Sequence, residues 1–323
     1  MPASLRLFPE PPPKPPALPA WARPGRAGEA SPDSGFLAGA ALAAIDPIAR
    51  SSHPLSTLWR RRLALKAAEN LVRLQGRVET AAEIRDHFFL TRDGGDPGPA
   101  GRILEAMRAL CDARALDKRW RTLLPELLQI RVDDAFTGRF ETALAAAENE
   151  VNPIAAAALV AEGCLRGFPE TPLPALWLAD AVLARRLRWP APVPLLAAHL
   201  TRRDIKLSGS PSGVGSRPET GSRLTAGPWL SACIQAYARG AAEAADLYGD
   251  LITRAEKLLF VAPKLRAKDA EAVVMRLLTE DAQLAGPGAF ASDRSSRRLF
   301  ERLIKLGGAR ELTGRTTSRL YGL

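Results

Sequence analysis

The sequence predicts a mainly α-helical protein: a helical body followed by a small C-terminal unit that includes a β-hairpin. Alanine and leucine recur at helical spacing from Gly35 onward, as at Leu58, Leu63 and Leu71, and alternating strand patterns are absent from these segments. The last stretch, 268–323, reads instead as helix, connector, basic helix and hairpin. With 323 residues, of which 46% are hydrophobic, the chain is long enough to bury a substantial core in more than one domain.

Proline dominates the N-terminal end, residues 1–34. The run PEPPPKPPALP at Pro9–Pro19 lacks amide donors at its prolines and favours extended polyproline conformations over a packed core. We therefore predict that 1–34 is a disordered arm. The functional alternative is a recognition element of the PxxP type.

The predicted body, 35–262, is helical throughout. Asn152 is a suitable N-cap and precedes Pro153 at the first helical position, so one helix is expected to run from there to Gly167. Three consecutive arginines, 60–62, point in different directions around a helix and are expected to form a solvated face. The expected helical segments are 36–49, 55–76, 79–89, 102–116, 120–128, 136–148, 153–167, 174–187, a segment after Pro194, and 228–260 as one helix or two.

Two segments interrupt the body. Residues 91–102, TRDGGDPGPAGR, are rich in glycine and proline, and no strand pattern precedes them, so a structural break is favoured over a phosphate-binding loop. Residues 207–222, LSGSPSGVGSRPETGS, contain almost nothing to bury and are expected to form a flexible surface loop. The C-terminal unit, 263–323, begins at the proline that follows the last body helix.

The C-terminal unit matches the pattern of a winged helix-turn-helix. A first helix at 269–280 is followed by a basic helix, which Ser292 caps and Gly307 ends. Two short strands, 309–312 and 318–321, then form the wing. A typical unit has a middle helix, but the connector AQLAGPGAFA contains two glycines and a proline, so that helix is expected to be abbreviated or lost. The apolar residues expected to pack between the two helices are Val273, Val274, Leu277, Leu278, Leu299, Phe300, Leu303 and Leu306.

Basic residues concentrate in the same unit. Lys and Arg exceed Asp and Glu by ten over the chain, and 292–323 carries eight basic against three acidic residues, which is half of that excess. A basic helix and a wing suit the phosphates and base edges of a duplex, so we predict a regulatory DNA-binding protein with duplex DNA as its partner. The residues expected to contact DNA are Ser292, Arg294, Ser295, Arg297, Arg298, Arg302, Lys305, Arg315 and Arg319. The alternative is a winged fold that docks on another protein or forms a homodimer, with these arginines solvated.

Signals of catalysis are sparse in this chain. The histidines are His53, His87 and His199, none of which lies in a metal-ligand or nucleophile motif. We therefore predict no metal site, no cofactor and no catalytic residue. The alternative is an enzyme with a pocket in the helical body around Glu162, Arg166 and Asp180, where two acids lie within apolar helices.

The start of the chain and its cysteines bear on its location. MPASLRLF lacks the apolar run of a secretory signal, and the longest apolar stretch, 36–45, ends at an Asp-Pro pair. The three cysteines form no CxxC pair and are expected to be buried thiols in a reducing compartment. We therefore expect a cytoplasmic protein without a membrane partner.

Two resemblances to known families cover the chain. Leu306–Leu323, LGGARELTGRTTSRLYGL, resembles the end of the C-terminal winged helix of Fic-family and related bacterial regulators, a likeness that covers roughly residues 268–323. The whole chain is similar to an uncharacterised, largely alphaproteobacterial family known only as a domain of unknown function. That similarity lies in FLAGAALAAIDPI, in DPGPAGR (Asp96–Arg102) and in LADAVLARRLRWPAPVPLL (Leu178–Leu196), and it implies no activity.

The body is also similar to Fic proteins, which place the motif HPFxDGNGR between two helices ahead of the winged tail. The corresponding segment is Leu165–Asp180, where Phe168-Pro169 match the middle of the motif and Glu170 its acidic position. Arg166 or Gly167 replaces the catalytic histidine, and 171–174 replace the phosphate-binding Gly-Asn-Gly-Arg. The resemblance therefore implies a degenerate Fic-like bundle without nucleotide-transfer activity.

Overall fold

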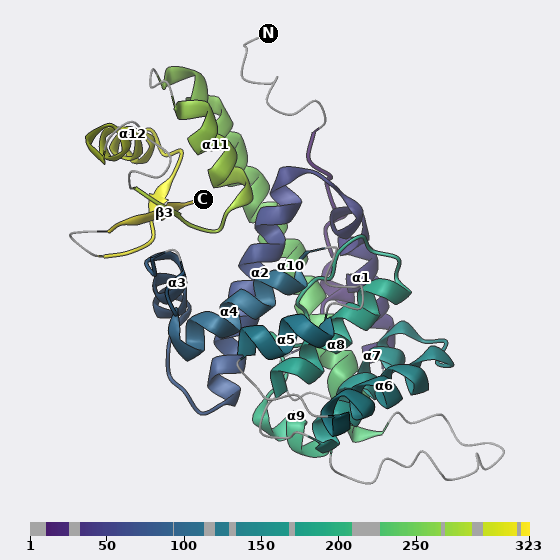
Figure 1. Cartoon of the computed structure of the whole chain (residues 1–323). Helices are drawn as coiled ribbons and strands as arrows, with labels where there is room; N and C mark the ends of the chain where they lie inside the picture. Colours follow the sequence, from purple (N-terminus) through teal and green to yellow (C-terminus); the bar gives the residue numbers. More distant parts are fainter. Residues whose placement is uncertain are drawn as a thin grey trace, which may run out of the picture.

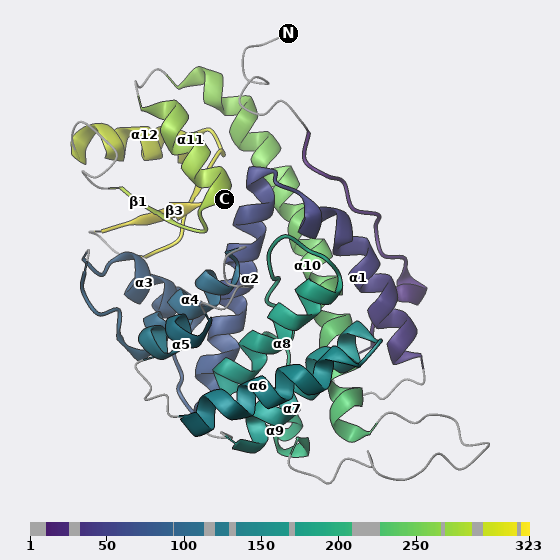
Figure 2. The ribbon, with the colours of Figure 1, turned by 45° about the vertical axis from the view of Figure 1, so that its right-hand side comes forward.

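A computed structural model of the chain describes residues 11–25, 33–92, 94–112, 120–128, 134–167, 172–208, 227–265, 269–285, 293–314 and 318–323. At 123–124, 127–128, 134–136 and 293–294 it describes the backbone alone. The described residues form twelve α-helices and one three-stranded antiparallel sheet, so the prediction of a mainly helical fold is confirmed. Figures 1 and 2 place α11, α12 and the sheet at one end of the molecule and α6, α7 and α9 at the other.

Three helices form the centre of the body. Helix α1 (Ser34–Arg50) packs lengthwise against α10 (Pro228–Val261), and α2 (Pro54–Leu74) packs against the same helix (Figure 1). Helix α10 is one continuous helix of 34 residues, where the sequence allowed one helix or two. Its buried face is rich in alanine and includes Gly240, and such small residues allow neighbouring helices to approach closely.

The other body helices pack in two groups around this centre. The first group follows α2 and consists of α3 (Ala81–Phe89), α4 (Gly98–Leu110) and α5 (Trp120–Leu128). The second consists of α6 (Asp134–Glu148), α7 (Pro153–Gly167) and α8 (Pro172–Arg186). Both groups bury apolar side chains in the same core as α1, α2 and α10.

Buried tryptophans join the groups to one another. The indole N–H of Trp59 donates to the carbonyl of Ala244 in α10 at 2.7 Å. Trp177 of α8 donates to Ala106 O in α4 at 3.0 Å, and Trp229 of α10 donates to an α7 carbonyl at 2.9 Å. Each ring buries a large apolar area while its one polar atom is satisfied, so these contacts fix the mutual positions of the helices.

Local sequence signals define the helix starts. Asn152 Oδ1 accepts hydrogen bonds from the N–H groups of Ile154 and Ala155 at 2.9 and 3.1 Å, which confirms the predicted cap of α7. Thr80 and Glu83 form a capping box at the start of α3. Helix α4 begins at Gly98, earlier than the predicted start at residue 102, so the glycine-rich break is shorter than expected.

The prediction of a helix after Pro194 is wrong. Residues 190–200, all of which the structure describes, form an irregular and largely buried segment, and the next helix is α9 (Arg202–Leu207). Prolines at 190, 192 and 194 keep the first half of the segment out of a helix. In the second half, Asp180 and Asn70 bond to the backbone groups of Leu195, Leu196, Ala197 and Leu200 in place of helical partners. The segment is nevertheless buried because polar side chains of the body satisfy its backbone, as described below.

The prediction of an unpacked N-terminal arm is wrong for residues 11–25. Leu18 and Ala22 are buried in the body core, and Trp21 stacks on Phe36 of α1. Arg23 forms a bidentate ion pair with Asp246 of α10, at 2.8 and 2.9 Å. The prediction followed the proline-rich composition of the segment. It missed this packing because a few apolar residues within an extended segment suffice to hold it on a helical surface. The other residues of the predicted arm up to 32 lie outside the described part of the chain, as do 209–222 of the predicted flexible loop.

The C-terminal unit alternates helices and strands. Its elements are α11 (Ala270–Thr279), β1 (Gln283–Leu284), α12 (Asp293–Lys305), β2 (Arg310–Glu311) and β3 (Leu320–Gly322). The sheet order is β1-β3-β2, with Gln283 opposite Tyr321 and Arg310 opposite Gly322. The two strands after α12 therefore form the predicted antiparallel hairpin. Strand β1 was not predicted, since two residues of connector carry no alternating pattern.

The two helices of this unit share a core with the sheet. Phe300 stacks on Tyr321 with 4.2 Å between ring centroids. The apolar residues predicted to pack here are buried, apart from the half-buried Leu306. None of the described helices is long and apolar enough to cross a lipid bilayer.

Candidate functional site

Helix α12 has a largely apolar buried face and a basic exposed face. Ser296, Leu299, Phe300 and Leu303 are buried and, at about 100° per residue, they form a single stripe along the helix. Arg298 and Lys305 lie opposite this stripe, with Arg302 and Arg297 on either flank and Glu301 between them. All four basic side chains are exposed, and none forms an ion pair or a side-chain hydrogen bond with a described residue.

The other predicted contact residues are distributed unevenly. Ser295 is exposed in the first turn of α12, and Arg294 belongs to the same turn by its backbone. Arg319 is exposed beside β3, and its guanidinium lies 3.4 Å from the carboxylate of Glu311 on β2. Ser292 and Arg315 lie outside the described residues. The structure therefore brings the four basic residues of α12 together and leaves Arg319 partly neutralised.

Helix α12 lies at the periphery of the molecule. In Figures 1 and 2 it is next to α11 and the small sheet, and α3 lies beneath the sheet. Its exposed face also carries one apolar side chain, Ile304, which is 39% exposed. A straight helix with a basic outer face at the edge of a molecule is accessible to a large anionic partner.

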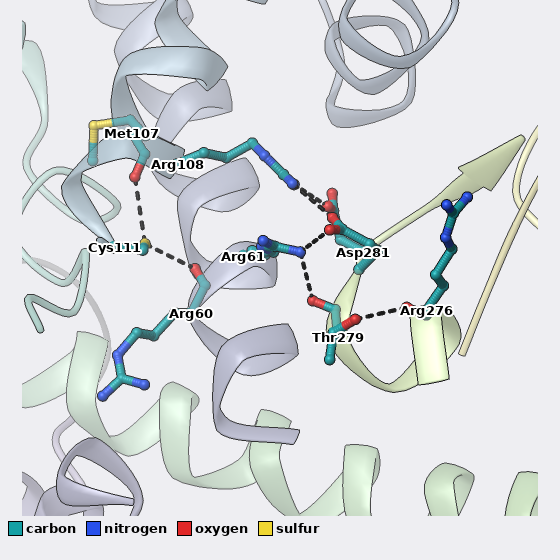
Figure 3. Close-up of polar contacts among 9 residues, drawn as sticks. Arg60, Arg61, Met107, Arg108, Cys111, Arg276, Thr279 and Asp281 are labelled. Carbon is teal, nitrogen blue, oxygen red and sulfur yellow. Dashed lines mark hydrogen bonds and ion pairs between the residues drawn. The ribbon is translucent and has the colours of Figure 1, made fainter. Parts of the chain in front are cut away.

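The C-terminal unit is attached to the body through a charged junction. Arg108 of α4 donates to Glu280 at 2.7 Å and pairs with Asp281, which is fully buried (Figure 3). Arg61 of α2 pairs with Glu280 and donates to the carbonyl of Thr279 at 2.9 Å. The guanidinium of Arg108 also lies over the rings of Phe88 and Phe89, at 5.0 and 5.3 Å. We call these four charged residues, Arg61, Arg108, Glu280 and Asp281, the body–tail junction.

Two further arginines bond to the ends of the small sheet. Arg62 donates to the C-terminal carbonyl of Leu323 at 3.1 Å, and Arg85 of α3 donates to Leu312 O at 2.7 Å. Burial lowers the pKa of Arg62 to about 10, which nearby Asp281 partly offsets. The expectation that arginines 60–62 form a solvated face is therefore wrong. Arg60 is buried and donates to the nearby carbonyls of Ala49 and Ser56. The partners of Arg61 and Arg62 are more than 200 residues away in sequence, so no local pattern signals their contacts.

The three residues predicted to line a body pocket do not form one site. Glu162 and Arg166 pair at 2.8 Å on α7, at the edge of a surface depression of about 520 Å³ between α6 and α7. Asp180 does not line that depression: it is buried in the core and accepts the N–H groups of Leu195 and Leu196 at 3.1 and 3.0 Å. Its role here is to hold the 190–200 segment.

His53, Cys111 and Cys164 occupy structural positions in the helical body. His53 Nδ1 accepts the N–H of Leu55 at 3.2 Å and caps α2. Burial raises the pKa of the Cys111 and Cys164 thiols to about 12, so both are protonated at neutral pH. Within the described residues, no three metal-ligating side chains lie together.

A family comparison accounts for nearly the whole chain. Residues 11–323 match the model of a family described as "Protein of unknown function (DUF1403)", and the chain belongs to that family. No curated protein and no solved structure matches the chain significantly.

Proposed function

We propose that this member of the DUF1403 family binds duplex DNA through the exposed basic face of α12. The observation that carries the proposal is the contrast between two sets of arginines. Arg61, Arg62, Arg85 and Arg108 are engaged by partners within the chain, whereas Arg297, Arg298, Arg302 and Lys305 are exposed and unpaired among the described residues. Unpaired guanidinium groups on one helix face complement the phosphates and base edges of a duplex.

The architecture of 270–322 supports α12 as a recognition helix. The order helix, strand, helix, strand, strand of the described residues is that of a winged helix-turn-helix without its middle helix, and 286–292 of the connector lie outside the described residues. In such a unit the helix before the hairpin enters the major groove. The body–tail junction holds this unit on the body, so that α12 would be presented to DNA in a fixed orientation. A regulatory role and a homodimer that pairs two such helices on successive half-sites extend the same proposal.

The competing enzymatic function receives less support from the predicted residues. Glu162 is neutralised by Arg166, and the depression beside them is lined by Arg139, Thr142 and small or apolar residues. A general acid–base pair needs two groups that converge on one substrate position, and Asp180 is buried elsewhere. A degenerate Fic-like origin of the body stays a prediction, since 168–171 lie outside the described residues.

The test measures fluorescence anisotropy of labelled duplex DNA with the full chain over a salt series. We expect wild-type affinity to fall steeply as salt rises. The triple variant Arg298→Ala/Arg302→Ala/Lys305→Ala should bind at least about tenfold more weakly, with a salt slope smaller by roughly 2 to 3, because each phosphate contact contributes about 0.9 to that slope. Capture of genomic fragments by the full chain then shows whether binding is sequence-specific, as regulation requires.

The matched control is Arg139→Ala/Arg185→Ala/Arg203→Ala, which removes the same charge from exposed positions on the body. It should bind DNA about as the wild type does. Equal losses in the two triple variants would mean that net charge alone drives binding, and a wild type that ignores DNA at low salt would exclude the proposal. In that case docking of α12 on another protein is the function to test.

A further inference from the structure

A second polar site lies in the body, where α10 meets the irregular segment between α8 and α9. A pocket of about 420 Å³ is lined there by Ala198 and His199, by Arg239, Ala242, Glu243 and Asp246 of α10, and by residues 23–25. This volume falls within the range of roughly 300–1,000 Å³ that is usual for small-molecule sites. The pocket is independent of α12 and of the proposed contact with DNA.

Polar side chains of the body hold the 190–200 segment in a position where His199 lines this pocket. The Asp180 carboxylate accepts the N–H groups of Leu195 and Leu196, and Asn70 Nδ2 donates to the carbonyls of Ala197 and Leu200, at 2.8 Å each. Gly240 of α10 permits the close approach, because a Cβ there would lie 3.1 Å from Leu195 O and 3.2 Å from His199 Cδ2. His199 is therefore held between the backbone contacts of the 190–200 segment and the face of α10 at Gly240. Its ring forms no hydrogen bond with a described residue.

The charges around the pocket are paired, with one exception. Arg23 pairs with Asp246 at 2.8 Å, and Lys66 pairs with Glu243, whose carboxylate lies 3.8 Å from His199 Nε2. Arg239 is half-buried and forms no hydrogen bond or ion pair with any described residue. Burial lowers the pKa of Arg239, and Asp204 of α9 only partly offsets this effect. The Asp204 carboxylate is itself engaged by Thr201 in the cap of α9. The pocket therefore holds an unpaired guanidinium and an unbonded imidazole.

We propose that this pocket, the Arg239–His199 pocket, binds a small oxyanion, a phosphate or carboxylate group of a metabolite. Arg239 supplies the charge and a planar set of N–H donors, and the imidazole of His199 supplies a further donor. A cationic ligand is disfavoured: Asp246 and Glu243 are neutralised by Arg23 and Lys66, so the unpaired Arg239 leaves the site with a net positive charge. An oxyanion also offsets the cost of keeping Arg239 partly buried without a counter-ion.

The ionisation of His199 is consistent with an anionic ligand. Burial, together with the nearby cations Lys66 and Arg239, lowers the pKa of His199 to about 3, so the imidazole is neutral at neutral pH when the pocket is free. A bound anion would counter both cations and raise this pKa. The His199 resonance is therefore a direct reporter of occupancy.

The test uses NMR of the full chain with histidine-selective isotope labelling and inorganic phosphate as the probe. The His199 signal is assigned by its loss in His199→Gln. We expect phosphate to shift this signal saturably and to leave the signals of His53 and His87 in place, while chloride at equal ionic strength does not shift it. Arg239→Gln should weaken phosphate binding at least about tenfold, because a charge-assisted contact is removed. Acetate in place of phosphate distinguishes a carboxylate site from a phosphate site.

The control variant is Arg203→Gln, which removes an equal charge from an exposed position on α9 and should bind phosphate as the wild type does. Thermal unfolding checks that each variant is folded. If Arg239→Gln is not, Arg239→Lys, which keeps the charge and loses the planar fork, should still bind phosphate more weakly than the wild type. The proposal is overturned if neither phosphate nor acetate shifts the His199 signal, if chloride produces the same shift, or if the folded Arg239 variant binds as tightly as the wild type.

Discussion

Two polar side chains, the buried Asp180 and the half-buried Asn70, determine the path of the backbone between α8 and α9. A buried segment without helical hydrogen bonds must find other partners for its amides and carbonyls, and Asp180 and Asn70 supply them. Burial raises the pKa of Asp180 to about 7, although its hydrogen bonds from backbone N–H groups favour the charged form. Asp180 is therefore a structural residue with a measurable effect on stability.

Asp180→Asn should lower the free energy of unfolding by about 1–3 kcal/mol, because the amide offers one acceptor to two N–H donors. It should also remove a pH dependence. An unfolded Asp has a pKa of about 3.9, so between about pH 4 and about pH 7 the folded chain holds one more proton than the unfolded chain. The contribution of Asp180 is thus fully present below about pH 4 and is lost as pH rises toward 7. Urea unfolding at about pH 5 and about pH 8 measures it.

The exposed Asp250 provides the comparison for this variant. Asp250→Asn should leave both the stability and its pH dependence close to those of the wild type. If Asp180→Asn retains the wild-type slope between the two pH values, the carboxylate does not titrate in this window and its pKa lies lower than burial implies.

At the scale of elements, local signals are strong where a helix end is exposed. Asn152 meets two free N–H groups at the start of α7, and Thr80 with Glu83 does the same for α3. The amphipathic pattern of α12 likewise predicts its buried stripe. Hydrophobic periodicity gives the wrong prediction for 190–200. Leucines and alanines are buried there in an irregular conformation that only the surrounding helices make possible.

Asn152→Ala should destabilise the chain by about 1 kcal/mol, because two amides at the start of α7 lose their acceptor. Asn152→Asp keeps a capping oxygen and should cost much less. Urea unfolding at one pH compares the two variants with the wild type. Equal losses for Ala and Asp would show that the cap contributes nothing to stability.

At the scale of the whole molecule, the body and the C-terminal unit act as one structure through their junction. Asp281 is fully buried and Arg108 nearly so, while Asp281 Oδ2 and the side-chain amide of Gln283 find no hydrogen-bond partner among the described residues. Removing one member of a buried ion pair leaves an uncompensated charge, which costs more than the pair contributes. The junction is therefore the position at which one substitution would affect both parts.

Arg108→Met should lower the free energy of unfolding by roughly 3–5 kcal/mol, because Asp281 is left buried without its partner. Arg108→Met/Asp281→Asn should recover a substantial part of this loss, since position 281 then carries no buried charge and Glu280 keeps its pair with Arg61. Urea unfolding gives the energies, and hydrogen exchange in 270–322 shows whether the C-terminal unit is released first. A double variant no more stable than Arg108→Met would argue that the packing of Arg108 on Phe88 and Phe89 is what matters.

The sequence by itself determined the helical class of this protein, most helix positions, the hairpin after α12 and the basic character of that helix. These features depend on periodicity, capping residues and composition over short windows, which are local properties. The pair of Glu162 and Arg166 is also local, because residues four apart on a helix are neighbours.

Only the tertiary structure decided which charged residues are free and which are engaged. Arg61, Arg62 and Arg108 have the same local appearance as Arg298 and Arg302, but the first three meet partners that the chain brings from its other end. The same holds for Arg239 and His199, which share a pocket because Gly240 lets two distant segments approach. Long-range packing decides which partners these side chains meet. Because burying a charge without a partner costs free energy, these partners determine the state of each charged residue. They follow from the assembled fold and not from any single stretch of sequence.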